Sequence, residues 1–141
     1  MVQENSLKKV IVICGSTASG KTSLAIEVAK KLNTEVISAD SLIIYKGLNI
    51  GTAKPTQAEM QGVKHHLIDV CEPTSEFSVS DYSDIAIPII DELHSEGKIP
   101  VICGGTGFYI NSLLFDLSYG QVAGSAEIRQ KYEDLAKEKG V

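Results

Sequence analysis

The sequence predicts an α/β fold, in which a parallel sheet is flanked by helices. Short apolar runs alternate along the chain with segments of helical periodicity, the pattern of a sheet covered by helices on both faces. The first run, Val-Ile-Val-Ile-Cys at residues 10–14, is continuously apolar, which is typical of a parallel strand buried on both faces. The 141 residues are enough for about one domain.

The other elements follow from side-chain periodicity and from residues that begin helices. Apolar residues spaced i, i+4 and i+8 within residues 23–32 predict a helix. Ser78 and Asp81 have the spacing of a capping box, which marks the start of another helix. The expected strands cover residues 10–14, 35–39, 66–70 and 99–103, and the expected helices cover residues 23–32, 78–95, 108–114 and 126–138.

Charge and composition exclude several classes of protein. A net charge of −5 argues against a broad nucleic-acid-binding face. The apolar runs are too short to cross a membrane, and no signal-peptide pattern is present, so we expect a cytoplasmic protein without a membrane partner. The three cysteines lack Cys-x-x-Cys spacing and are expected to be reduced. The oligomeric state is left open, with a monomer favoured.

A glycine-rich loop connects the first predicted strand to the first predicted helix. Its pattern, Gly-x-x-x-x-Gly-Lys-Thr, in this context predicts a phosphate-binding loop and a P-loop NTPase-like fold. Backbone N–H groups and the helix N-terminus surround phosphate oxygens in such loops. The lysine adds a full positive charge, and the threonine hydroxyl binds magnesium. The predicted phosphate-binding residues are Gly15, Ser16, Thr17, Ala18, Ser19, Gly20, Lys21 and Thr22, with Thr22 as the Mg²⁺ ligand.

This loop fits ATP, GTP or another diphosphate equally well, so it predicts nucleotide or diphosphate binding without naming the ligand. We expect residues 1–120 to form the P-loop α/β core. Residues 121–141 are expected to begin a further helical region of a longer chain, because the last predicted helix is mostly polar.

Two more segments are expected at the ligand-binding edge of the sheet, beyond the carboxyl ends of the strands. Asp40 follows the second predicted strand, and Thr106 lies among three glycines after the fourth. A carboxylate beside phosphates suits a general base or a water-mediated magnesium ligand, and a threonine hydroxyl can hydrogen-bond a reacting group. The alternatives are that Asp40 caps a turn and that Thr106 only shapes its loop.

Phosphoryl transfer is the main competing function. Asp69 ends an apolar run, as the acid of an ATPase strand does. Kinases for small substrates, however, clamp the transferred group with several arginines, and this chain has only Arg129. A nonenzymatic nucleotide-binding module is a third class. His65 and His66 are expected to make local hydrogen bonds and not to bind a metal, because no third ligand is spaced with them.

Six segments, taken in order, resemble the tRNA dimethylallyltransferase family, the tRNA isopentenyltransferases of bacteria. They cover nearly the whole chain. The sequence departs from the family pattern at Ser16, where proline is usual, and at Leu42 and Ile43, where Met-Gln is usual. The six segments are Gly-Ser-Thr-Ala-Ser-Gly-Lys-Thr at residues 15–22, Ser-Ala-Asp-Ser at 38–41, Asn-Ile-Gly-Thr-Ala-Lys-Pro at 49–55, His-His-Leu-Ile-Asp at 65–69, Phe-Ser-Val at 77–79 and Gly-Gly-Thr-Gly-Phe-Tyr-Ile at 104–110.

The resemblance implies an enzyme that transfers a dimethylallyl group from dimethylallyl diphosphate to N6 of an adenosine beside the tRNA anticodon, with release of pyrophosphate. It implies that Asp40 accepts the proton of the attacking amine and that Thr106 orients the reactants. The loop and Mg²⁺ would stabilise the leaving diphosphate. The implied partner is the tRNA anticodon stem-loop, and the implied tRNA contacts are Asp40, Ser41, Leu42, Ile43, Thr106 and Arg129.

Overall fold

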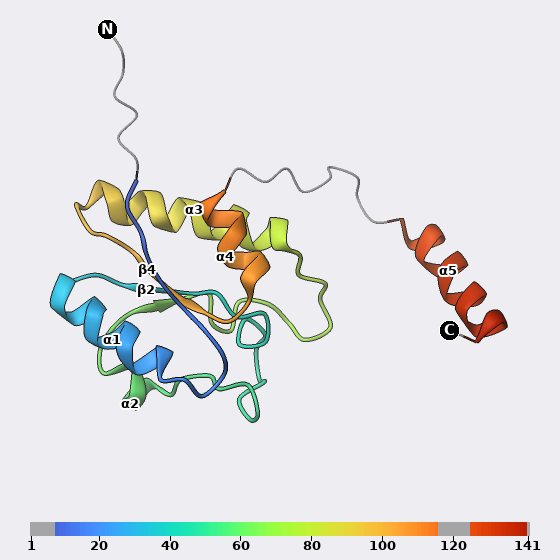
Figure 1. Cartoon of the computed structure of the whole chain (residues 1–141), viewed down its shortest axis with the longest axis horizontal. Helices are drawn as coiled ribbons and strands as arrows, with labels where there is room; N and C mark the ends of the chain where they lie inside the picture. Colours follow the sequence, from blue (N-terminus) through green and yellow to red (C-terminus); the bar gives the residue numbers. More distant parts are fainter. Residues whose placement is uncertain (1–7, 116–124, 141) are drawn as a thin grey trace, which may run out of the picture.

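Helices cover both faces of a parallel sheet (Figure 1). The structure is a computed structural model that describes residues 8–115 and 125–140. The parallel sheet flanked by helices confirms the predicted fold class. In chain order the elements are β1 (Ile11–Cys14), α1 (Lys21–Leu32), β2 (Val36–Ser38), α2 (Gln57–Met60), β3 (His65–His66), α3 (Val79–Ser95), β4 (Val101–Gly104), α4 (Gly107–Leu114) and α5 (Ala126–Lys139).

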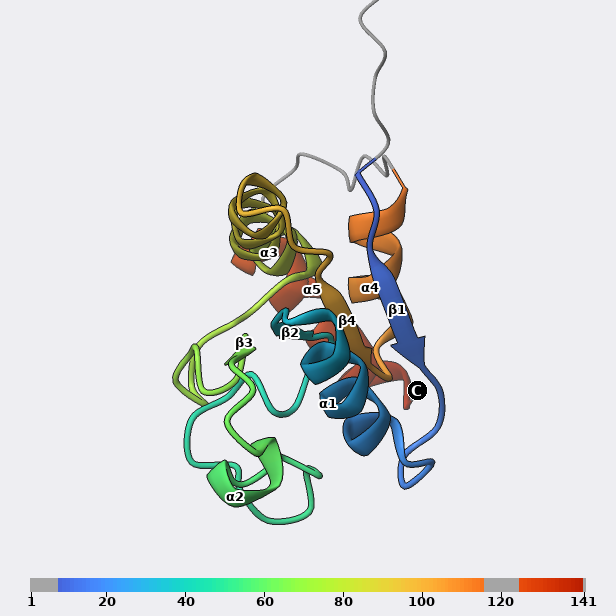
Figure 2. The same cartoon turned by 90° about the vertical axis from the view of Figure 1, so that its left-hand side faces the viewer.

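The four strands of the described sheet lie in the order β1-β4-β2-β3, and every neighbouring pair is parallel. β4 therefore separates the strand before the glycine-rich loop from the strand before Asp40. Because the strands point the same way, their carboxyl ends meet at one edge of the sheet. Figure 2 shows β1 running into the loop that precedes α1 at that edge.

Side chains of β2 and β4 alternate between two hydrophobic cores, as the period of a strand requires. Val36 and Val101 pack with Ala25 and Ala29 of α1 on one face. The neighbouring residues of both strands turn to the opposite face and pack against α3 and α4. That larger core consists of Ile37, Ala39, Ile44, Leu67, Tyr82, Ala86, Ile90, Leu93, Ile102, Tyr109 and Ile110.

Two buried tyrosines connect this larger core to the end of β2. The rings of Tyr82 on α3 and Tyr109 on α4 stack with centroids 4.1 Å apart. The Tyr82 hydroxyl donates a hydrogen bond to the Ser38 carbonyl at 2.9 Å. Burial raises the pKa of the Tyr82 hydroxyl, which is therefore a permanent donor. This contact anchors the backbone two residues before Asp40.

β1 differs from the expectation for its first run. Both faces of the strand contact a core, Val12 on the larger one and Ile11 and Ile13 on the α1 side. Within the described residues, however, β1 pairs with β4 alone and forms an edge of the sheet. Ile11, Val12 and Ile13 are consequently only partly buried and Cys14 is exposed, so the predicted burial on both faces is incomplete.

The predicted strand over residues 66–70 is wrong beyond His66. Leu67 and Asp69 have φ angles of +63° and +55°, which are incompatible with an extended chain. The amide of Asp69 donates to the carbonyl of Ile43 at 3.1 Å and that of Val70 to Ile44 at 2.7 Å. This segment therefore binds the loop that follows Asp40 and does not continue the pairing with β2.

The helices expected over residues 78–95, 108–114 and 126–138 are present as α3, α4 and α5. The capping box at Ser78 and Asp81 is confirmed: the Asp81 amide donates to the Ser78 hydroxyl at 3.1 Å, and the Asp81 carboxylate accepts from the Ser78 amide at 2.7 Å. The charged helix predicted at residues 126–138 is α5, which buries no side chain. The sequence predicts a core over residues 1–120 and a further helical region over residues 121–141. Residues 1–7, 116–124 and 141 of these two regions lie outside the described residues.

None of the helices in residues 8–115 and 125–140 has the length and hydrophobicity needed to cross a membrane.

Gly104 permits a close approach between β4 and the end of β2. A Cβ atom at Gly104 would lie 2.1 Å from the carbonyl oxygen of Ala39, whereas one at Gly107 would meet nothing within 4 Å. We expect Gly104→Ala to lower the free energy of unfolding by roughly 1–3 kcal/mol, the cost of overpacking. Gly107→Ala, in the first turn of α4, should leave it unchanged or raise it.

Urea unfolding of the two variants measures this difference. Equal unfolding midpoints for Gly104→Ala and the unsubstituted protein would show that the backbones separate without cost.

Candidate active site

Residues 15–20 form a tight turn between β1 and α1. Gly20 immediately precedes α1 with a φ of +81°, a conformation that is easy only for glycine. Ala18 has a φ of +60°, which costs a non-glycine residue roughly 1–2 kcal/mol. Backbone strain of this kind is concentrated at functional sites. The turn thus has the local conformation expected of a phosphate-binding loop.

Positive charge at the start of α1 is uncompensated. The first turn of α1 contains no acidic residue, so the partial charge of the helix N-terminus is available to an anion. The Lys21 ammonium folds back over the loop, where it donates to the Ser16 carbonyl and lies 3.4 Å from the Ser19 hydroxyl. Both contacts are exposed, so a phosphate can replace them without burying a charge.

The loop faces a cavity of about 180 Å³. Its lining comes from the phosphate loop and the start of α1, from β2 and β4, from the chain after Asp40, and from β3 and the segment that follows it. Asp40 and the phosphate loop therefore line the same cavity at one edge of the sheet, as the sequence predicts. The lining residues are Thr17, Ala18, Ser19, Gly20, Lys21, Thr22, Ser23, Val36, Ser38, Asp40, Ile43, Ala53, Pro55, His65, Ile68, Cys103, Gly104 and Gly105.

Asp40 makes the turn-capping contact that the sequence offered as one alternative, and its role as a base stays a prediction. Its Oδ1 accepts hydrogen bonds from the amides of Leu42 at 2.8 Å and Ile43 at 3.4 Å, so the side chain does cap a turn. Among the described residues Oδ2 accepts no hydrogen bond, and the carboxylate lines the cavity. The cap fixes the carboxylate, and the second oxygen is left for an incoming group.

Thr106 lies beside the residue that follows Asp40. Its Oγ1 accepts from the Ser41 amide at 2.9 Å and lies 3.3 Å from the Ser41 hydroxyl. Its own amide donates to the Ala39 carbonyl at 3.0 Å. Thr106 does not line the cavity of the phosphate loop. In this structure its hydroxyl therefore shapes the Asp40 turn, and a contact with a reactant stays a prediction.

The remaining residues expected to contact tRNA lie in different environments. Leu42 is 52% exposed, whereas Ile43 is buried and forms part of the cavity wall. Arg129 is on α5, where its Nη1 forms an exposed ion pair with Glu76 at 2.7 Å. The structure brings Ser41, Leu42 and Ile43 together with Asp40 and Thr106. It does not bring Arg129 to the cavity.

Two buried polar atoms in the cavity lining have no partner. They are the hydroxyl oxygen of Ser38 and Nε2 of His65. His65 Nδ1 is 2.9 Å from the Val63 carbonyl, which makes Nδ1 the protonated nitrogen and Nε2 an acceptor. Buried polar atoms normally have hydrogen-bond partners, so both atoms leave hydrogen-bonding capacity unused in residues that line the cavity.

Neither Ser38 nor His65 was identified as a cavity residue from the sequence. The available signal for Ser38 was its spacing, because residues two apart in a strand share a face and Asp40 is two residues later. His65 and His66 do make the expected local contacts, and His66 Nε2 is 2.5 Å from a Glu35 oxygen. Within the described ranges no three or more His, Cys, Asp and Glu side chains are grouped to hold a metal.

Fold and site together define a phosphate-loop α/β protein whose loop faces a carboxylate across one cavity. The family model described as IPP transferase matches residues 43–141. The chain belongs to this family.

Individual relatives are named tRNA dimethylallyltransferases. The chain is 53% identical to the tRNA dimethylallyltransferase of Acetivibrio thermocellus, over 95% of this chain and 43% of the relative. It is 46% identical to that of Bacillus subtilis, over 96% and 43%. The chain thus spans less than half the length of these curated relatives.

Solved structures agree with the fold. The full-length tRNA isopentenylpyrophosphate transferase of Bacillus halodurans matches with a TM-score of 0.78 at 44% identity, over 93% of this chain and 43% of that one. A eukaryotic dimethylallyltransferase described as acting on tRNA matches with a TM-score of 0.76 at 34% identity, over 85% and 31%.

The unpartnered nitrogen of His65 makes the stability of the fold pH-dependent. Burial lowers the pKa of His65 below its ordinary value of 6.5, so the unfolded chain takes up this proton more readily than the folded one. The contribution of neutral His65 to stability is present above about pH 6.5 and is lost as the pH falls below it. We expect His65→Gln, which cannot ionise here, to lose less stability on acidification than the unsubstituted protein.

Urea unfolding midpoints at about pH 7.5 and about pH 5.5, which bracket the titration, measure the two losses. The same loss in both proteins would exclude His65 as the titrating group.

Proposed function

We propose that this chain is the catalytic core of an enzyme that transfers a dimethylallyl group from dimethylallyl diphosphate to tRNA. The acceptor is N6 of an adenosine beside the anticodon, and pyrophosphate is released. The observation that carries the proposal is the single cavity in which the phosphate loop faces Asp40. Such a cavity holds a diphosphate and a proton acceptor on opposite sides of one reacting carbon.

The diphosphate is held on the loop side as a leaving group. The allylic C–O bond breaks, and its electron pair departs with the diphosphate. Loop amides, the N-terminus of α1 and Lys21 would stabilise the negative charge that develops there, since the first turn of α1 has no acidic residue and Lys21 lies over the loop. Stabilisation of this kind is usually the largest single contribution to a lowered barrier. The scarcity of arginine agrees with this role, since no phosphoryl group is transferred and none has to be clamped.

Asp40 receives the proton on the opposite side. The lone pair of the adenosine amine forms the new C–N bond, and the amine loses a proton to the free oxygen of the carboxylate. The two amides that hold Oδ1 keep the accepting oxygen in place. A correctly placed base contributes about 10²–10⁴-fold to a rate.

The apolar part of the cavity suits the group that is transferred. Val36, Ile43, Ala53, Pro55 and Ile68 line it together with the phosphate loop. A dimethylallyl group offers no hydrogen bonds and is best placed against such surfaces. Kinase and GTPase substrates would put a sugar or base there, with polar atoms that these side chains do not satisfy.

The donor set at the loop fits Mg²⁺. Thr22, Ser38 and Asp40 are oxygen-bearing residues that line the cavity, and magnesium prefers oxygen ligands shared with substrate phosphates and water. Thr22 would bind the ion, and Ser38 and Asp40 would contact its water ligands. When bound, the ion neutralises charge on the leaving diphosphate.

tRNA would approach from the side of the Asp40 turn. Ser41 and exposed Leu42 lie next to the carboxylate, at the rim of the cavity. The ion pair of Arg129 with Glu76 is exposed, and exposed pairs are worth only about 0–1 kcal/mol. Arg129 can therefore exchange Glu76 for a tRNA phosphate at little cost.

The test is an assay with labelled dimethylallyl diphosphate and a tRNA anticodon stem-loop, run on the protein at its full natural length. Label should appear on the RNA, and adenosine monophosphate should not be a substitute acceptor. Phosphate transfer from ATP without prenyl transfer would instead favour a kinase. Tight binding of ATP with no turnover would favour a nonenzymatic binding module.

Asp40→Asn is expected to reduce turnover by about 10²-fold or more, because the amide cannot accept the proton. The asparagine oxygen can still cap the turn, so the loss of turnover should be much larger than any loss of affinity for magnesium pyrophosphate. Turnover equal to that of the unsubstituted enzyme would remove Asp40 from the role of base.

Lys21→Met is expected to weaken the binding of pyrophosphate, because a full positive charge beside the phosphates is lost. Lys31→Met is the matched control, since Lys31 is at the other end of α1 in an exposed pair with Glu27. Isothermal titration calorimetry measures both affinities. A loss of equal size in the two variants would indicate a general charge effect and not a specific contact.

A further inference from the structure

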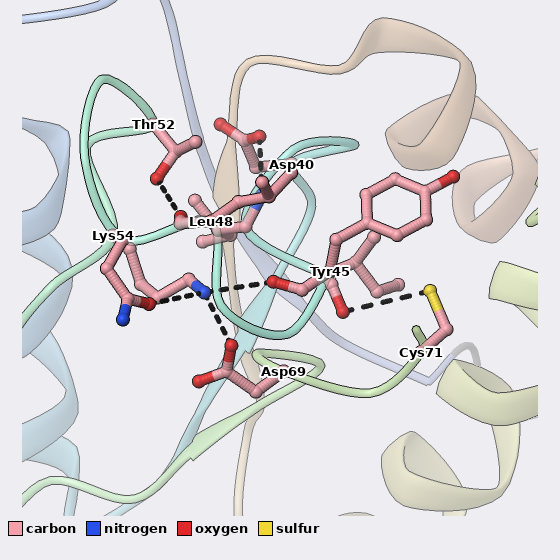
Figure 3. A network of polar contacts seen from close by, with 10 residues as sticks. Asp40, Tyr45, Leu48, Thr52, Lys54, Asp69 and Cys71 are labelled. Atoms are coloured by element: carbon pink, nitrogen blue, oxygen red, sulfur yellow. Dashed lines mark hydrogen bonds and ion pairs between the residues drawn. The ribbon is translucent and has the colours of Figure 1, made fainter. Parts of the chain in front are cut away.

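Lys54, which lies between two residues that line the cavity, has an almost completely buried side chain. The Lys54 side chain is only 6% exposed, while its partner Asp69 is 47% exposed. The Lys54 ammonium donates to Asp69 Oδ1 at 2.5 Å, to the Tyr45 carbonyl at 3.0 Å and to Asn49 Oδ1 at 3.0 Å. Figure 3 shows the ammonium between the Tyr45 carbonyl and the Asp69 carboxylate, which come from two separate parts of the chain.

These three bonds exclude a direct role in phosphate binding. An ammonium group has three protons to donate, and each of them has an oxygen acceptor within the protein. Lys54 also does not line the cavity of the phosphate loop. By contrast, Lys21 is only partly buried and makes exposed contacts that a phosphate can replace. The two lysines therefore have different roles: Lys21 is available to a phosphate, and Lys54 is held by acceptors of the protein.

A short series of hydrogen bonds connects Lys54 to the carboxylate of Asp40. Lys54 holds the side chain of Asp69, whose backbone amide donates to the Ile43 carbonyl at 3.1 Å. The amide of Ile43 in turn donates to Asp40 Oδ1 at 3.4 Å. Asp69 has a φ of +55°, an unfavourable conformation that needs such contacts to persist.

Lys54 also fixes the wall of the cavity through its neighbours in sequence. Ala53 and Pro55 both line the cavity, and Ala53 has a φ of +53°. The chain on either side of Lys54 therefore lines the cavity, while Lys54 itself does not and is anchored by its hydrogen bonds. Loss of the anchor would release Ala53 and Pro55 together with the turn after Asp40.

We propose that Lys54, through its ion pair with Asp69, is a positioning residue that sets both the orientation of the Asp40 carboxylate and the apolar wall opposite the phosphate loop. The proposal rests on the proposed function for its kinetic consequence, because the base must meet the amine within a narrow geometry. Its structural consequence, the ordering of residues 43–55 and 67–71, is independent of that function.

The test compares Lys54→Met with a matched control. Methionine keeps a long apolar side chain but removes the charge and all three hydrogen bonds. Lys8→Met is the control, because Lys8 forms an ion pair with Asp91 at the same distance of 2.5 Å but with side chains 60% and 50% exposed. Hydrogen exchange by mass spectrometry, magnesium pyrophosphate affinity and the kinetics of prenyl transfer are measured on the full chain.

For Lys54→Met we expect amide exchange in residues 43–55 and 67–71 to accelerate about tenfold or more, with α1 and β4 unchanged, as in a local opening. Turnover at saturating substrate should fall about 10- to 100-fold, the cost of misplacing a catalytic group by about 1 Å. Pyrophosphate affinity should be unchanged, because the phosphate loop is not touched. Lys8→Met should alter none of these quantities.

Three results would overturn the proposal. Unchanged exchange in residues 43–55 and 67–71 would mean that Lys54 does not order the wall. Faster local exchange with unchanged turnover would make Lys54 a residue of stability alone. A loss of pyrophosphate affinity as large as the loss of turnover would make it part of the phosphate site. If the unsubstituted enzyme transfers no prenyl group, the proposed function fails and the exchange data still decide the structural role.

A second variant keeps the proposal testable if Lys54→Met does not fold. Asp69→Asn retains the shape and one acceptor oxygen but removes the negative charge. It should fold, because Asp69 is half exposed. Amide exchange in residues 43–55 and 67–71 should accelerate and turnover should fall, both by less than in Lys54→Met. Asp69→Asn with the exchange and turnover of the unsubstituted protein would contradict the ion pair as the source of order.

Discussion

The close contact between the backbones of Ala39 and Gly104 is the constraint on which the site depends. The Ala39 amide donates to Cys103 at 2.8 Å, and the Ala39 carbonyl accepts from Thr106 at 3.0 Å. A side chain at Gly104 would occupy the position of that carbonyl. Because the two chain segments touch here, Asp40 and Thr106 leave the sheet side by side, and Thr106 can hold Ser41.

The two lysines near the cavity, Lys21 and Lys54, differ in how firmly the protein holds their ammonium groups. Lys21 is only partly buried and makes exposed contacts that a ligand can replace, whereas the ammonium of Lys54 is buried and fully bonded. A buried ion pair is costly to break, because removal of one partner leaves an uncompensated charge. The first lysine can therefore follow a leaving group, while the second keeps the wall of the cavity still.

Much of the fold follows from local pattern. The apolar run before the loop, the helical spacing after it and the capping box at Ser78 each depend on neighbours within a few residues, and each was predictable. The extent of β3 was not, because Leu67 and Asp69 leave the extended conformation to bond a loop more than twenty residues away. The edge position of β1 was also hidden, since strand order is not a local property.

The sequence by itself determined that a phosphate loop, a carboxylate and a glycine-rich turn would meet at one edge of a parallel sheet, because motif spacing and strand direction fix that geometry. The tertiary structure alone decided which polar atoms are left without partners and which lysine is buried. Those properties depend on what packs around Ser38, His65 and Lys54. Packing joins residues from separate segments, and no local pattern in the chain encodes it.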